Sequence, residues 1–110
     1  MTTAIFLGDG HRFKGFVISG HAGYGSVGSD IVCAAVSSAA FMSANALSLD
    51  DKNAKISICE GKVTVLIDNP NDFNQRILKA LKFQLSDIMR QYPENLRLCT
   101  LTLTGGKNNV

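Results

Sequence analysis

The chain has 110 residues, the size of one domain with a modest core. Eleven Lys and Arg against nine Asp and Glu give a net charge of +2, too small to indicate a nucleic-acid or anionic-membrane partner. No apolar run approaches the length of a membrane span, and the first ten residues lack the basic start of a signal peptide. Three cysteines without a C-x-x-C pair predict neither a disulfide framework nor a zinc site, so we expect a cytoplasmic protein without a metal or cofactor.

The first half of the chain predicts a hairpin followed by a buried helix. Residues 4–7 and 12–19 are predicted as strands around a turn at residues 8–10. Residues 31–47 are predicted as a helix capped by Ser29 or Asp30, and its content of Ala35, Ala39, Ala40, Ala44 and Ala46 indicates close approach to a neighbouring element. Because this helix carries so little charge, we expect one side to face the sheet and another to face a second subunit in a symmetric homodimer.

The second half predicts another hairpin, an amphipathic helix and a last strand. Residues 55–59 and 62–68 alternate at period two around Glu60-Gly61. The helix opens at residues 69–72, where Pro70 suits the first turn, and ends before Pro93. Its expected apolar face consists of Phe73, Ile77, Leu81, Leu85, Ile88 and Tyr92. In the last strand Leu96 and Leu98 are out of phase with Leu101 and Leu103, which predicts a bulge near Cys99 and Thr100.

The order ββαββαβ predicts a single α+β domain over residues 1–110, with two helices packed on a mainly antiparallel sheet. Strand order does not follow from the sequence. Residues 105–110 are expected to be a frayed tail. This order bears on the literal G-x-G-x-x-G from Gly23 to Gly28, which follows a strand and opens a helix as a dinucleotide-binding turn does. After the helix, however, the chain turns straight back into a second strand, so a nucleotide or phosphate binder is kept only as an alternative.

The segment from Gly20 to Ser37 holds the residues most suited to chemistry. Cys33 falls near the predicted start of the helix, where free N–H groups and the helix dipole favour a thiolate. His21 ends the preceding strand, and the glycine-rich connection allows it to reach the sulfur. A thiol beside an imidazole is the minimum for nucleophilic catalysis. The non-catalytic alternatives are that Cys33 is a small buried residue and that His21 is a loop histidine hydrogen-bonded only to backbone groups.

Two polar residues flank Cys33 on the predicted helix. Asp30, Cys33 and Ser37 lie at i, i+3 and i+7 and therefore share one stripe, which favours a cleft over a core. Asp30 either caps the helix or orients His21, and Ser37 either faces the cleft or bonds back to the preceding turn. The remaining thiols and imidazole are expected to be structural or exposed: Cys59, Cys99 and His11.

The elements Gly20-His21-Ala22 and Gly28-Ser29-Asp30-Ile31-Val32-Cys33-Ala34-Ala35-Val36-Ser37 resemble the ribosomal-processing cysteine proteases, a family often called Prp. The resemblance extends over nearly the whole chain. It implies a small α+β domain that forms homodimers, and a bacterial cysteine endopeptidase that removes the N-terminal extension of large-subunit ribosomal protein twenty-seven. Carried over by position, it makes His21 the general base and Cys33 the nucleophile, with Asp30 and Ser37 at further motif positions and no assigned third triad member.

The resemblance also fixes the expected partners and the substrate loop. The partners are the N-terminal peptide of a ribosomal protein and a second copy of the chain, with no direct nucleic acid and no membrane. Backbone N–H groups of residues 25–30 are candidate oxyanion donors, because glycines let the chain approach a substrate closely. An alternative keeps the fold as a non-catalytic, ribosome-associated module that only holds a peptide. The residues expected in the substrate loop are Gly20, Ala22, Gly23, Tyr24, Gly25 and Gly28.

Overall fold

The computed structural model describes residues 1–20 and 27–103, so the tail expected at residues 105–110 lies outside it. Within the described residues the chain forms five strands and two helices in the predicted order ββαββαβ. The elements are β1 (Thr2–Gly8), β2 (Phe13–Ser19), α1 (Val27–Asp50), β3 (Lys55–Cys59), β4 (Lys62–Leu66), α2 (Asp72–Gln91) and β5 (Leu96–Thr102).

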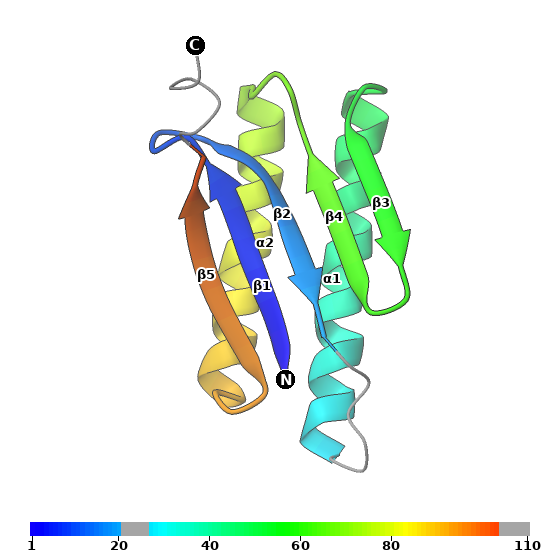
Figure 1. Cartoon of the computed structure of the whole chain (residues 1–110), viewed down its shortest axis with the longest axis vertical. Helices are drawn as coiled ribbons and strands as arrows, with labels where there is room; N and C mark the ends of the chain where they lie inside the picture. Colours follow the sequence, from blue (N-terminus) through cyan, green and yellow to red (C-terminus); the bar gives the residue numbers. More distant parts are fainter. Residues whose placement is uncertain (21–26, 104–110) are drawn as a thin grey trace.

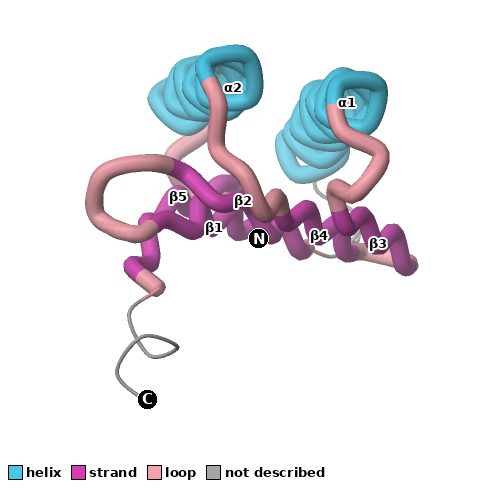
Figure 2. Tube along the Cα trace, turned by 90° about the horizontal axis from the view of Figure 1, so that it is seen from above, coloured by secondary structure: helices cyan, strands magenta, loops and turns pink. Residues whose placement is uncertain are grey.

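The five strands form one sheet in the order β3-β4-β2-β1-β5 (Figure 1). The pairs β3–β4, β4–β2 and β2–β1 are antiparallel, and only β1–β5 is parallel. Both helices lie on the same face of the sheet, α2 over the β1–β5 side and α1 over the β3–β4 side (Figure 2). The predicted α+β class with a mainly antiparallel sheet is therefore confirmed, and the structure supplies the strand order.

One buried stripe orients α1 against the sheet. Its members are spaced by three or four residues, and each is at most 3% exposed: Val32, Val36, Ala40, Ala44 and Leu47. From the sheet, Phe6, Phe16 and Val65 are completely buried in the same cluster. Burying one Val, Leu or Phe side chain is worth about 1.5–3 kcal/mol, so a rotation of α1 that lifted this stripe from the sheet would be costly.

The helix α1 is longer at both ends than the predicted residues 31–47. It begins at Val27 and ends at Asp50, so Ser29 and Asp30 lie inside its first turn and neither is the cap. The first turn of a helix tolerates Gly, Ser and Asp, because its N–H groups have no intrahelical partner to lose. The expectation that no apolar run approaches a membrane span was also wrong by length and composition, since residues 31–50 pass that test. A helix packed in a protein core passes it too, and α1 packs on the sheet.

The helix α2 is capped as its sequence suggests, but its buried face is rotated from the expected one. Asn71 is the N-cap, so Pro70 precedes the cap and is not in the first turn. Asn71 and Asn74 exchange side-chain-to-backbone hydrogen bonds of 2.8 and 2.9 Å, forming a capping box. Phe73 is 44% exposed, contrary to the expectation that it faces the core. The buried residues are Asn74, Gln75, Leu78, Leu81, Leu85 and Ile88.

The bulge expected in the last strand is absent from the described structure. β5 pairs with β1 in continuous register from Thr2↔Leu96 to Gly8↔Thr102. The change of phase has another cause. Alternate residues of β5 point to opposite faces, so Leu101 lies on the face opposite to the buried Leu96, and it is 53% exposed. The register shift of the sheet lies instead between Leu7 and Gly8, where β1 pairs with β2.

Gln75 joins α2 to the start of β2, and we predict that its loss destabilises the fold. Its side chain accepts the N–H of Phe13 and donates to the carbonyl of Phe13, both at 2.8 Å. Gln75→Ala leaves both backbone groups unpaired, which costs about 2 kcal/mol in the free energy of unfolding. The matched control is Gln91→Ala at the exposed end of the same helix, which should change that free energy by less than about 0.5 kcal/mol. Equal urea midpoints for the two variants would contradict this role of Gln75.

Candidate active site

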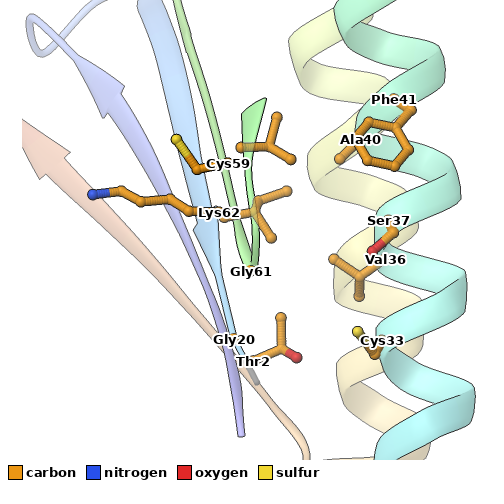
Figure 3. Close-up of a pocket in the computed structure, with 12 residues that line it drawn as sticks. Thr2, Gly20, Cys33, Val36, Ser37, Ala40, Phe41, Cys59, Gly61 and Lys62 are labelled. Carbon is orange, nitrogen blue, oxygen red and sulfur yellow. The ribbon is translucent and has the colours of Figure 1, made fainter. Parts of the chain in front are cut away.

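A pocket of about 80 Å³ opens between α1 and the adjoining strand ends (Figure 3). Cys33 and Ser37 line it from α1, and both are half-buried. Figure 3 shows the sulfur of Cys33 and the hydroxyl of Ser37 directed towards the sheet, and the hydroxyl of Thr2 directed towards α1. The predicted stripe of Cys33 and Ser37 thus borders a cleft, while the side chain of Asp30 lies outside the described structure.

Thr2 is a pocket residue that the sequence reasoning missed. It is only 6% exposed, and it stands at the first position of β1 beside the end of β2. Nothing in the local sequence marks it, because its place at the pocket follows from the pairing of β1 with β2 and β5. The pocket therefore has three polar atoms on its walls, from Thr2, Cys33 and Ser37.

Gly20 is held at the edge of this pocket, directly before His21. Its N–H donates to the carbonyl of Gly61 at 3.0 Å, and a Cβ at Gly20 would lie 2.7 Å from Thr2 Oγ1 and 2.9 Å from Thr2 Cα. Gly61 has φ +75°, and a Cβ there would lie 2.9 Å from the carbonyl oxygen of Gly20. Because both glycines fill space that no side chain can enter, the chain leaves β2 at a fixed point beside the pocket.

The other expected loop residues fall largely outside the description. His21, Ala22, Gly23, Tyr24 and Gly25 lie outside the described residues, so their contacts with Cys33 are not defined. Gly28 belongs to the first turn of α1. The candidate oxyanion donors at residues 25–30 are thereby divided: residues 27–30 form the first helical turn, whose N–H groups have no partner within the helix.

The longer helix changes the electrostatic argument for Cys33. The sequence placed Cys33 near the helix start, but it is the seventh residue of α1. The effect of the helix dipole falls off within the first turn, so the terminus alone is a weak source of thiolate stabilisation at Cys33. The N–H groups of the first turn, which have no partner within the helix, lie about one turn before Cys33. This favours those groups as donors to a substrate oxygen.

The remaining thiols and imidazole differ clearly from Cys33. Figure 3 shows the sulfur of Cys59 and the ammonium of Lys62 directed away from α1, although both residues border the pocket. Cys99 is exposed on β5. His11 lies in the turn between β1 and β2, and seven-residue strands separate it from the Gly20 end by about 20 Å. Since the chain has two histidines, a histidine base at this pocket must be His21.

The geometry also bears on two other kinds of site, a metal centre and a dinucleotide-binding turn. Among residues 1–20 and 27–103, no three His, Cys, Asp or Glu side chains gather to hold a metal ion. A dinucleotide turn joins adjacent parallel strands, whereas β4 separates β2 from β3 and pairs antiparallel with both. The fold therefore contradicts a dinucleotide-binding unit at the glycine motif.

The comparison with family models decides the class. The model described as cysteine protease Prp matches residues 1–97. The chain belongs to the cysteine protease Prp family. It is 32% identical over 108 residues to the ribosomal processing cysteine protease Prp of Staphylococcus aureus strain Mu50, covering 89% of this chain and 96% of that protein.

Solved structures give the same result. Prp from S. aureus in complex with a substrate peptide matches with a TM-score of 0.83 and 29% identity, covering 92% of this chain and 100% of that one. The same protease with a covalently linked product peptide matches with a TM-score of 0.79, 31% identity and the same coverage. SMU.848 from Streptococcus mutans shares the fold, with a TM-score of 0.76 at 23% identity, covering 94% of this chain and 96% of that one. The protein is thus a cysteine protease, and Cys33 is the cysteine whose sulfur faces the pocket.

The contacts of Gly20 with Thr2 and Gly61, here called the Gly20 clamp, lead to a prediction for stability and activity. Gly20→Ala should lower the free energy of unfolding by about 1–3 kcal/mol, because the new methyl group overlaps the backbone of Thr2. It should also slow peptide cleavage by about a hundredfold if His21 is the base expected from the sequence, since a shift of about 1 Å in the residue before it would spoil its alignment with Cys33. Thermal melting and a peptide assay measure the two effects. Ser19→Ala is the neighbouring control, and equal activity in both variants would show that the clamp does not position the site.

Proposed function

We propose that this Prp-family protease removes the N-terminal extension of large-subunit ribosomal protein twenty-seven. Three observations support the proposal. The chain is 32% identical to a ribosomal processing protease over nearly its full length. A matching structure holds a substrate peptide and another holds a covalently linked product peptide. The observation that carries the proposal for this chain is the pocket itself, where the Cys33 thiol and the residue before His21 border one space.

The proposed mechanism is acyl transfer through Cys33. His21 takes the proton of the Cys33 thiol, and the thiolate attacks the scissile carbonyl carbon to form a tetrahedral intermediate. His21 then returns the proton to the leaving amine as the C–N bond breaks, which leaves a thioester on Cys33. Water, deprotonated by His21, attacks the thioester and regenerates the thiol. Asp30 and Ser37 are proposed as supporting residues: Ser37 borders the pocket one turn after Cys33, and Asp30 precedes Cys33 by three residues.

The oxyanion that develops in each tetrahedral intermediate needs hydrogen-bond donors. We assign this role to the backbone N–H groups at the start of α1, which have no partner within the helix and precede Cys33 by about one turn. Donors of this kind are fixed before the substrate arrives, so they need no reorganisation during the reaction. Residues 20–25 and Gly28 are proposed to form the surrounding substrate loop.

We predict that Cys33→Ala and His21→Ala each reduce cleavage of a peptide spanning the processed junction by at least about a thousandfold. Each variant removes one half of the acyl-transfer machinery and leaves the buried stripe of α1 intact. The matched controls are Cys99→Ala and His11→Ala, which remove the same chemical groups away from the pocket and should cleave at the wild-type rate. Full activity in purified His21→Ala would refute its role as general base, and binding of the peptide without turnover by the wild type would favour the module that only holds a peptide.

Alkylation provides a second measurement on the same proteins. Cys59 and Cys99 are exposed whereas Cys33 is half-buried, so accessibility alone makes Cys33 the slowest of the three thiols. A thiolate held by His21 reverses that order, because the thiolate is the reacting species. Mass spectrometry after a short iodoacetamide pulse near neutral pH should therefore find Cys33 modified first in the wild type and last in His21→Ala. If Cys33 is slowest in both, no activated pair exists in the resting enzyme.

We also propose that the enzyme works as a homodimer in the cytoplasm, where ribosomal proteins are made. All three cysteines are unpaired, which is typical of a reducing compartment. The outer face of α1 leaves apolar side chains uncovered in one chain: Ile31 is 49% exposed, Met42 73% and Leu49 89%. Beside Met42, an uncharged groove of about 470 Å³ runs between α1 and α2. A second copy of this face is the occupant we propose.

A charged side chain at this face should separate the subunits. We predict that Met42→Arg converts a dimeric wild type into a monomer at micromolar concentration, because the arginine would be buried without a partner in the interface. The control is Leu101→Arg, the same kind of change on the uncovered face of the sheet, which should remain dimeric. Sedimentation velocity distinguishes the cases. A monomeric wild type, or dissociation by Leu101→Arg alone, would exclude the α1 interface.

A further inference from the structure

A basic groove with an exposed aromatic ring lies on the α2 side of the molecule, away from Cys33. Two adjoining concavities of about 340 and 290 Å³ share Phe13 and Lys79. The first lies between α2, the end of β5 and the turn that contains Arg12. The second continues along α2 past Lys82 and Phe83.

The groove concentrates positive charge that the whole chain does not show. Arg12, Lys79 and Lys82 border the two concavities, and no Asp or Glu does. These three charges exceed the net charge of +2, so the rest of the chain is slightly acidic. Among the described residues the only ion pair joins Arg90 and Asp87, so acidic side chains do not neutralise the groove.

Asp9 lies in the β1–β2 turn but borders neither concavity, and its carboxylate is hydrogen-bonded to the backbone of the turn. Its carboxylate accepts the N–H groups of Arg12 and His11, both at 2.9 Å. These hydrogen bonds lower the pKa of Asp9 below its ordinary value of 3.8. The hydroxyl groups of Thr100 and Thr102, at the end of β5, supply neutral donors on the opposite wall.

An aromatic ring distinguishes this groove from a solvated helix surface. Phe83 is 75% exposed, although a phenylalanine normally buries most of its area. It borders the same concavity as Lys79 and Lys82, and Lys82 lies over the ring of Phe13 at 5.5 Å from its centre. Aromatic faces flanked by cations in a groove are the pattern that binds single-stranded nucleic acid, where bases stack on the rings and phosphates contact the cations.

We propose that this groove, formed by α2, the β5 end and the β1–β2 turn, binds single-stranded RNA. The net charge predicted no nucleic-acid partner, but net charge does not report how the fold distributes the cations. The exposed ring favours a nucleic acid over an acidic peptide, because a carboxylate chain has no planar groups to stack on it. The choice of RNA over DNA rests on the proposed function in ribosomal processing. The groove would keep the protease on an RNA-containing substrate particle while the pocket at Cys33 cleaves the peptide.

The test is fluorescence anisotropy with a labelled twelve-residue oligouridylate, titrated with protein at several salt concentrations. The wild type and Cys33→Ala should bind equally, with a Kd of the order of 10⁻⁵ M, so binding is measured independently of catalysis. Lys79→Gln/Lys82→Gln should weaken binding about tenfold and reduce the slope of log Kd against log salt by about 1.4, as expected for two lost phosphate contacts. Phe83→Leu should weaken binding by at least about fivefold with an unchanged slope.

Matched controls make the outcome decisive. Lys52→Gln/Lys55→Gln removes the same charge from exposed positions outside the groove and should bind like the wild type. The two groove variants and the control pair should cleave the junction peptide at the wild-type rate in the absence of RNA. The proposal is overturned if the wild type does not bind saturably, if the control pair weakens binding as much as the groove pair, or if Phe83→Leu binds normally. Equal competition by polyglutamate, tighter binding of DNA or duplex RNA, or a loss of peptide cleavage in the groove variants would also overturn it.

Discussion

The position of the site depends on how the buried stripe of α1 fixes the rotation of that helix. Val32, Val36 and Ala40 are each at most 1% exposed and face the sheet. Cys33 and Ser37 follow Val32 and Val36 by one residue each, so they lie beside this stripe, about 100° around the helix. They therefore face the edge of the helix–sheet contact, where the pocket opens. A change that rotated α1 would carry Cys33 into the core or into solvent, which links the packing of small residues directly to the chemistry.

The same helix also determines how Cys33 becomes reactive. Because α1 begins at Val27, Cys33 lies beyond the first turn, where the dipole acts most strongly. The proposed mechanism therefore assigns the activation of Cys33 mainly to His21, which follows the pocket residue Gly20 in the chain. Under the proposed mechanism, the first-turn N–H groups stabilise the substrate oxyanion and His21 activates the thiol.

The sequence predicted those features that depend on local pattern. Alternation located the hairpin of β3 and β4, and the stripe of Cys33 and Ser37 correctly pointed to a cleft. The start of α1 was misread, because a Gly-Ser-Asp run has the composition of a loop although it fits a first helical turn. Phe73 was placed in the core by its spacing, but the hydrogen bonds of Gln75 to β2 turn α2 so that Phe73 is partly exposed.

Features that depend on strand order could not be predicted from the sequence. Thr2 reaches the pocket only because β1 lies inside the sheet, between β2 and β5. The clamp on Gly20 likewise joins three segments that are distant in sequence, at Thr2, Gly20 and Gly61.

The distribution of charge follows from the same topology. Arg12 and the cations of α2 are more than sixty residues apart, and they come together because Gln75 docks α2 on the start of β2. The net charge does not reveal this gathering of cations, because it sums the charges on all faces of the molecule. The helix layer thus has an uncharged side at α1 and a basic side at α2, with the cysteine pocket at the sheet edge of α1. Each surface is therefore open to substitution without disturbing the others, which is the condition for assigning their functions separately.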